Sequence, residues 1–193
     1  MADELSRRDR FETLFEDDPD PWDFETSSYE REKRKHTIDS LGGRRFECAL
    51  EIGCATGALT EELADISGKI IGIDIADRAL AIARTRLADR ANVTLIQGEL
   101  PYDWPAGSFD LIMFSEVLYF LSQEEIREVS SRALQSLSDD GVCLLVNWTG
   151  PSNLPLGGNE VVNLFAKAND WKHHPVGKAE RYRIDKLLPV RTV

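Results

Sequence analysis

Short apolar runs alternate with amphipathic segments through the middle of the chain. The runs occupy residues 46–52, 69–74, 92–97, 109–115 and 141–148, and segments with apolar positions at helical spacing lie between them at 56–64, 77–87 and 122–137. Alternating strands and helices are typical of βαβ units, which bring parallel strands into one sheet. The pattern predicts an α/β fold with a mostly parallel sheet and helices on both faces.

The helix expected at 122–137 has the clearest start. It opens on a capping box, in which Ser122 is followed three residues later by Glu125. Its apolar positions recur at helical spacing, which assigns that face to the core: Ile126, Val129, Ala133, Leu134 and Leu137. The Asp-Asp-Gly sequence at 139–141 predicts the turn before the next strand.

Two segments precede the first expected strand. Residues 1–26 are acidic and contain prolines, and they predict a mobile or irregular lead-in. Ser27 and Glu30 form a second capping-box pattern, which predicts a helix that runs to residue 41. Tyr29 and Lys33 share one face of that helix, because they lie one turn apart. We expect this helix to act as a lid over a ligand cleft.

The pattern beyond residue 148 is weaker. A short amphipathic helix is expected around 161–168 and a final strand at 181–188. His173 and His174 are adjacent and have no third ligand at a suitable spacing, so we expect them in a loop and predict no metal site.

Length and composition set the domain organisation. The chain has 193 residues, 42% of them hydrophobic and 30% charged, which suits one globular domain over 1–193. We expect a lead-in and lid at 1–41, a cofactor-binding core at 42–148 and a substrate-side segment at 149–193. Because no apolar run approaches membrane-spanning length and the first residues do not resemble a secretory signal, a cytoplasmic location and no membrane partner are expected.

Charge narrows the range of partners. A net charge of −11 disfavours nucleic acid, whose phosphates require a positive surface. A small-molecule or carbohydrate acceptor is expected instead. The three cysteines are widely spaced and odd in number, which fits packing roles in a reducing compartment. The sequence leaves the oligomeric state open.

The most informative motif follows the first apolar run. Residues 49–57 read Ala-Leu-Glu-Ile-Gly-Cys-Ala-Thr-Gly and join a strand to a helix through a glycine turn, an arrangement that lets backbone N–H groups approach a nucleoside cofactor. A pyrophosphate-binding fingerprint would require glycines at 53, 55 and 58. The chain instead has Ala55 and Ala58, with Glu51 ahead of Gly53.

Two carboxylates identify the expected ligand. Glu51 would repel the phosphates of a dinucleotide, whereas it suits a cationic ammonium or sulfonium group. Asp74 ends the next apolar run, where a carboxylate can accept hydrogen bonds from both ribose hydroxyls. S-adenosylmethionine (SAM) carries both cations and a ribose, so the motif favours SAM over a nicotinamide cofactor.

Four blocks resemble the class I SAM-dependent methyltransferases, and more narrowly a bacterial NodS-like family. They are Asp-Pro-Trp at 20–22 with Ser-Tyr-Glu-Arg-Glu-Lys at 28–33, the glycine block at 49–64, Phe-Asp-Leu-Ile at 109–112 with Ser-Glu-Val-Leu-Tyr at 115–119, and Asn-Trp at 147–148 with Tyr-Arg-Ile-Asp at 182–185. The resemblance implies a Rossmann-like fold with a seven-stranded sheet, and SAM as methyl donor. It also implies that Glu99, after the third strand, accepts a hydrogen bond from the adenine amino group.

The residues expected to bind the cofactor are Trp22, Tyr29, Lys33, Glu51, Gly53, Cys54, Ala55, Gly57, Asp74, Ile75, Glu99, Leu100 and Ser115. For the basic cluster Arg31, Lys33, Arg34 and Lys35 two readings stay open: a solvated helical face, or contact of Lys33 or Arg34 with the cofactor carboxylate. Glu116 and Tyr119 are the candidate catalytic residues, because the carboxyl end of a strand is where open α/β sheets bind ligands.

Three functions remain possible at this point. The first is methyl transfer from SAM to an amine or hydroxyl of a small molecule or sugar, an amino sugar among the options. The second is a non-catalytic SAM-binding partner protein. The third is a nicotinamide-dependent oxidoreductase or epimerase, against which Glu51 and the spacing of Gly53 and Gly57 argue.

Overall fold

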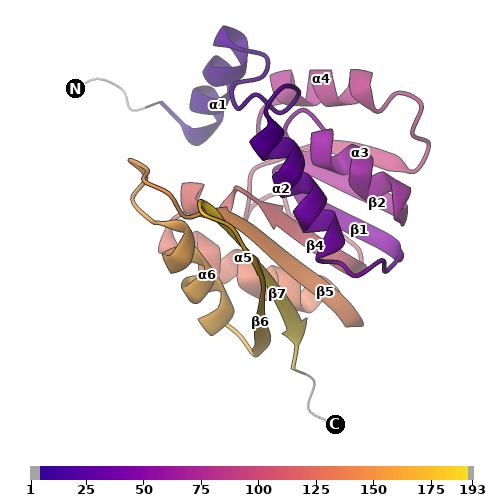
Figure 1. Ribbon diagram of the computed structural model, residues 1–193, viewed down its shortest axis with the longest axis vertical. Coiled ribbons are helices and arrows are strands. Elements are labelled where there is room, and N and C mark those ends of the chain that lie inside the picture. Colours follow the sequence, from indigo (N-terminus) through magenta and orange to yellow (C-terminus); the bar gives the residue numbers. More distant parts are fainter. Residues whose placement is uncertain (1–4, 191–193) are drawn as a thin grey trace.

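The computed structural model describes residues 5–190, so the ends of the predicted 1–193 domain lie outside the described residues. Seven strands form one sheet in the order β3-β2-β1-β4-β5-β7-β6 (Figure 1). Their bounds are β1 Phe46–Ile52, β2 Ser67–Asp74, β3 Val93–Gln97, β4 Phe109–Ser115, β5 Leu137–Trp148, β6 Trp171–Lys178 and β7 Tyr182–Pro189. The first five strands are parallel and β7 is antiparallel to both neighbours, which confirms the predicted mostly parallel sheet.

Helices cover both faces of the sheet (Figure 1). They are α1 Arg7–Asp17, α2 Ser28–Asp39, α3 Ala58–Asp65, α4 Asp77–Arg86, α5 Gln123–Ser136 and α6 Gly158–Lys167, with a short 3₁₀ helix, η1, at Leu118–Phe120. One core cluster joins the sheet to α5 and α6, and a second joins its opposite face to α3 and the end of α2. The predicted capping box of α5 is present, with Ser122 and Glu125 bonded to each other's backbone N–H groups.

The sheet has a switch point between β1 and β4. The chain passes from β1 to β2 on one side, whereas β4 pairs with the other side of β1. Connections that leave in opposite directions open a crevice at the carboxyl ends of these two strands. Gly53 follows β1 there and Glu116 follows β4, so the topology brings the two central motifs together.

The prediction of an irregular lead-in at 1–26 was wrong for residues 7–17, which form α1. Ser6 caps this helix by accepting a hydrogen bond from the Asp9 N–H. Phe15 is buried against alanines at the start of α4, and Figure 1 shows α1 beside α4. The Glu12 carboxylate accepts hydrogen bonds from the Asp77 and Arg78 N–H groups at 2.7 and 3.3 Å, and thereby caps α4. Long-range packing thus stabilises a helix in a segment whose composition predicted a mobile or irregular lead-in.

Two other expectations were wrong near the carboxyl end. The turn expected at 139–141 lies within β5, which begins at Leu137 and pairs with β4 through a register irregularity. The loop expected around His173 is strand β6, where the His173 ring lies 2.7 Å from the buried Asp185 carboxylate. Because β6 is at the edge of the sheet, its His, Pro and Gly residues are tolerated there, and its sequence shows little of the apolar–polar alternation that would have predicted a strand.

No helix among residues 5–190 is both long and apolar enough to cross a membrane.

Candidate functional site

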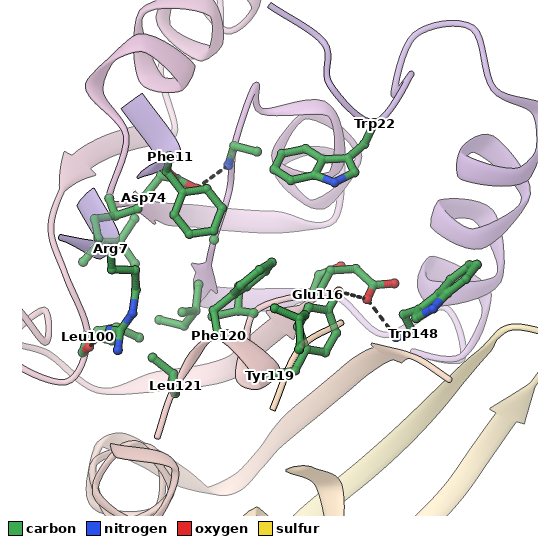
Figure 2. Close-up of a pocket in the computed structure, with 18 of the residues that line it drawn as sticks. Arg7, Phe11, Trp22, Asp74, Leu100, Glu116, Tyr119, Phe120, Leu121 and Trp148 are labelled. Carbon is green, nitrogen blue, oxygen red and sulfur yellow. Dashed lines mark hydrogen bonds between the residues drawn. The ribbon is translucent and has the colours of Figure 1, made fainter. Parts of the chain in front are cut away.

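A cavity of about 420 Å³ lies over the switch point and joins residues from both halves of the sheet. Figure 2 shows its two ends, with Arg7, Phe11, Asp74 and Leu100 at one and Glu116, Tyr119 and Trp148 at the other. A smaller hollow of about 50 Å³ lies against the glycine turn and is lined by Glu51, Cys54 and Thr56, among others. One continuous space therefore connects the two sets of residues to which the sequence assigned cofactor and acceptor.

The glycine turn comes close to neighbouring residues. Gly53 has φ +76°, and a Cβ there would lie 2.1 Å from a methyl group of Val117, so the backbone excludes a larger residue. Each Asp74 carboxylate oxygen accepts one backbone hydrogen bond at 2.9 Å, from Ala55 and from Ala76. Burial raises the pKa of Asp74, and these two hydrogen bonds oppose that rise. Asp74 thus holds the turn in place, and each of its carboxylate oxygens can still accept a further hydrogen bond from a ligand in the cavity.

Glu51 lies beneath the turn rather than at its mouth. Its side chain is 1% exposed and accepts a hydrogen bond from the Thr60 hydroxyl at 2.6 Å. Burial raises the pKa of Glu51 to about 8, with a smaller contribution from Asp74, whereas the Thr60 hydrogen bond opposes the rise. The carboxyl group therefore carries a proton at neutral pH until a cationic ligand favours its ionised form.

This raised pKa predicts a dependence of stability on pH. Between about pH 4.5, the ordinary pKa of glutamate, and pH 8 the unfolded chain has lost the Glu51 proton while the folded protein keeps it. The free energy of unfolding is therefore expected to fall as pH rises through this range, by about 1 kcal/mol per pH unit from this group. We expect Glu51→Gln to remove that slope in urea unfolding curves, with Glu47→Gln, an exposed neighbour on β1, as the control.

Arg7 closes one end of the cavity by joining three groups. Its guanidinium donates to a Glu99 oxygen at 3.2 Å, to the Leu100 carbonyl at 3.3 Å and to both Glu125 oxygens at 3.0 and 2.7 Å. The Glu125 pKa is lowered: burial acts to raise it, and hydrogen bonds from Ser122 and Arg7 outweigh that effect. The carboxylate expected to meet adenine, Glu99, is thus held by α1.

Glu116 connects three elements at the opposite end. It has φ +58°, a left-handed conformation that is strained for glutamate and is typical of functional sites. One carboxylate oxygen accepts from the Lys33 ammonium at 2.9 Å, and the other accepts from the Trp148 N–H at 2.8 Å and from the Tyr119 hydroxyl. Figure 2 shows Tyr119 and Trp148 on either side of it. Burial and this carboxylate raise the pKa of Tyr119, so the phenol stays protonated and donating.

Lys33 is buried, so a solvated face is the wrong description for this member of the basic cluster. Its ammonium lies between Glu30 and Glu116, at 2.9 Å from an oxygen of each. The Lys33 pKa is raised, because the two carboxylates outweigh the opposing effect of burial. Within the described residues its contacts are to protein carboxylates, and the Tyr29 ring lies 5.3 Å away. The expected contact between Lys33 and the cofactor carboxylate stays a prediction.

The predicted site residues mostly converge on the cavities. The larger one is lined by Trp22, Lys33, Gly53, Ala55, Asp74, Ile75, Glu99, Leu100, Ser115, Glu116 and Tyr119, and Glu51 and Cys54 line the smaller. Tyr29 and Gly57 line neither. Tyr29 packs edge-on between Trp148 and Tyr182, so it supports the wall from behind.

Sequence reasoning missed several lining residues that come from α1, α2 and η1. Arg7, Phe11 and Phe15 belong to α1, Glu30 to α2 and Phe120 to η1. The spacing of Phe11 and Phe15, one turn apart after a serine cap, was the available signal for α1. Within the described part of the chain no three His, Cys, Asp or Glu side chains form a group that could hold a metal ion.

Comparisons with known proteins agree with this geometry. The family model described as Nodulation protein S (NodS) matches residues 7–148. The chain is 35% identical over 155 residues to nodulation protein S of Sinorhizobium fredii, covering 80% of this chain and 65% of that protein. It is 36% identical over 125 residues to nodulation protein S of Azorhizobium caulinodans, covering 63% and 59%. The chain thus spans about three fifths of the length of these curated relatives.

A solved structure extends the comparison to the fold. The N-methyltransferase NodS from Bradyrhizobium japonicum, in complex with S-adenosylhomocysteine (SAH), superposes with a TM-score of 0.80 at 23% identity, over 94% of this chain and 98% of that one. The seven-stranded sheet with helices on both faces is thus the class I methyltransferase fold. Because the family model matches residues 7–148, most of its length, this chain belongs to the nodulation protein S (NodS) family.

Proposed function

We propose that this protein transfers a methyl group from SAM to the amine of a small-molecule or carbohydrate acceptor. The observation that carries the proposal is the single cavity that joins the Asp74 end to the Glu116 end. SAM supplies a methyl group that the sulfonium already activates, so the protein's tasks are alignment, exclusion of water and control of the acceptor's proton. The SAH bound by the Bradyrhizobium relative supports the choice of cofactor.

The residues around the turn fit this cofactor. Asp74 has carboxylate lone pairs left for ribose hydroxyls, and Gly53 lets a ligand approach the backbone. The Thr56 hydroxyl is buried without a partner among the described residues and lines the smaller hollow, where a polar group of the ligand would satisfy it. Glu51, whose pKa is raised to about 8 by burial, would ionise next to a cationic group of the ligand. The cofactor's amino-acid moiety is proposed for this hollow and its nucleoside for the Asp74 end.

The acceptor is proposed for the end at Glu116. Tyr119 and Trp148 give this end aromatic walls, and Leu154 and Leu156 add apolar surface. The Tyr119 hydroxyl donates to Glu116, which leaves its oxygen lone pairs to accept a hydrogen bond from an acceptor N–H. Glu116 would orient that phenol and stabilise positive charge on the acceptor nitrogen. These residues favour an amine acceptor over an anionic one.

Calorimetry tests the cofactor first. We expect micromolar binding of SAH to the full chain and no binding of NAD, and binding of NAD alone would overturn the methyltransferase proposal. Transfer of labelled methyl groups from SAM to glucosamine, with N-acetylglucosamine as the control without a free amine, then tests the acceptor class. If SAH binds and a panel of amines and amino sugars accepts no label, the non-catalytic SAM-binding alternative is favoured.

A further inference from the structure

The acceptor end of the cavity contains two carboxylates and a single ammonium group. Glu30 and Glu116 each place one oxygen 2.9 Å from the Lys33 nitrogen. Tyr29 and Tyr119 nearby are neutral, because burial and the neighbouring carboxylates raise both phenol pKa values. Lys33 compensates one carboxylate, so Glu30, Lys33 and Glu116 together have a formal net charge of −1 in a largely apolar cavity, where an unpaired charge is costly. The Arg181 guanidinium is a further cation, 5.9 Å from the Trp148 ring, and within the described part of the chain it makes no ion pair with either carboxylate.

The two carboxylates differ in what remains available to a ligand. Both Glu116 oxygens are occupied, one by Lys33 and the other by Tyr119 and Trp148. Glu30 receives a single hydrogen bond, from Lys33 to one oxygen, and its second oxygen has no partner within residues 5–190. That oxygen is not fully enclosed by protein, so it is open to a ligand in the cavity, whereas the Tyr29 hydroxyl is the polar atom of this cluster that is buried without a partner among the described residues.

Glu30 also lines the part of the cavity that we propose for the acceptor. The residue is 7% exposed, and it lines both the larger cavity and the smaller hollow, at the point where they adjoin Glu116 and Ser115. Its position in a capping-box pattern would assign its carboxylate to the backbone N–H of Ser27. The structure shows instead that Ser27 caps the Glu30 N–H while the Glu30 carboxylate binds Lys33.

We propose that Glu30 determines the acceptor class: its free carboxylate oxygen accepts a hydrogen bond from the acceptor nitrogen, which gains positive charge as it takes the methyl group, and thereby selects amines over neutral hydroxyl acceptors. This inference rests on the proposed function. The free amine forms the new N–C bond as the C–S bond of SAM breaks, so the positive charge passes from sulfur to the N-methylammonium product, which restores the charge balance of the cluster, whereas an alcohol leaves Glu30 uncompensated. No covalent step is assigned to Glu30.

Sinefungin allows a test that does not depend on the acceptor's identity. In this SAM analogue a carbon that bears an amino group replaces the sulfonium and its methyl, so an ammonium group projects toward the acceptor end. SAH has the same nucleoside and amino-acid moieties without that ammonium. The ratio of the two dissociation constants, measured by calorimetry at pH 7.5, therefore isolates recognition of a cation at the transfer point.

We expect the full-length wild-type protein to bind sinefungin about 10-fold more tightly than SAH, the effect of one charge-assisted hydrogen bond. Glu30→Gln keeps an acceptor for Lys33, so we expect it to bind SAH as the wild type does and to lose the preference for sinefungin. Glu30→Asp, which keeps the charge, is expected to retain part of it. Glu32→Gln, the same change on the exposed face of α2, is the control and is expected to leave both constants unchanged.

The remaining outcomes separate the two proposals. If neither ligand binds the wild type, the proposed function fails. If both bind and the wild type shows no preference, or Glu30→Gln keeps it, the assignment to Glu30 is overturned while the cofactor site stands. If Glu30→Gln weakens SAH and sinefungin equally, with an unchanged melting temperature, Glu30 contacts the shared amino-acid moiety instead, which also overturns the assignment.

Discussion

Replacing Asp74 with asparagine is expected to weaken binding of SAH by about 100-fold or more. Each carboxylate oxygen of Asp74 accepts one backbone hydrogen bond, from Ala55 and from Ala76. An asparagine must turn its NH₂ group toward one of these N–H donors, so the turn loses a contact as well as the charge that would bind the ribose. Hydrogen bonds to a charged group contribute about 1.5–3 kcal/mol each, and two of them account for this loss.

The measurement is calorimetric titration of Asp74→Asn with SAH, beside circular dichroism to show that the sheet is intact. Asp89→Asn is the matched control, because Asp89 is exposed in the loop after α4. A variant that binds SAH within a few-fold of the wild type would show that Asp74 serves the turn alone.

Glu116→Gln is expected to lower kcat by about 100-fold or more while the dissociation constant for SAH changes little. The carboxylate receives donors on both oxygens, from Lys33 on one and from Trp148 and Tyr119 on the other. A glutamine amide would place its NH₂ group against one of these donors in either orientation. The Tyr119 hydroxyl then loses its fixed direction, and Lys33 keeps Glu30 as its remaining carboxylate partner.

Single-turnover methyl transfer from labelled SAM, combined with SAH titration, separates the chemical step from cofactor binding. The control is Glu124→Gln, whose side chain is 82% exposed on α5. A Glu116→Gln enzyme with wild-type kcat would remove Glu116 from the proposed acceptor machinery. A large loss of SAH affinity at constant stability would reassign it to the cofactor.

Local sequence was sufficient wherever the fold depends on buried, regular elements. The five parallel strands were recognisable because both of their faces are covered, which makes each of them a short apolar run. The glycine turn was recognisable because Gly53 lies where a Cβ would overlap Val117. Asp74 followed from its place at the end of a strand. In these elements a residue's type reflects its immediate backbone environment.

The elements that the sequence did not predict depend on distant partners. The helix α1 is polar along most of its length, and its order comes from Phe15 against α4 and from Arg7 bound to Glu99 and Glu125. Glu30 matched a local capping rule, yet its carboxylate binds Lys33, which Glu116 holds from 83 residues away. A pattern of apolar positions contains no information on which charges a fold will bring together.

The contact between Glu12 and the start of α4 makes two segments far apart in sequence thermodynamically dependent on each other. The residue before α4, Ala76, has no side chain that could cap the helix, so the Asp77 and Arg78 amides rely on a carboxylate supplied by α1. Any detachment of α1 leaves those two amides without their protein acceptor. The hydrogen–deuterium exchange rates of the Asp77 and Arg78 amides therefore report how often α1 detaches from α4, and they can be measured without a label or a substrate.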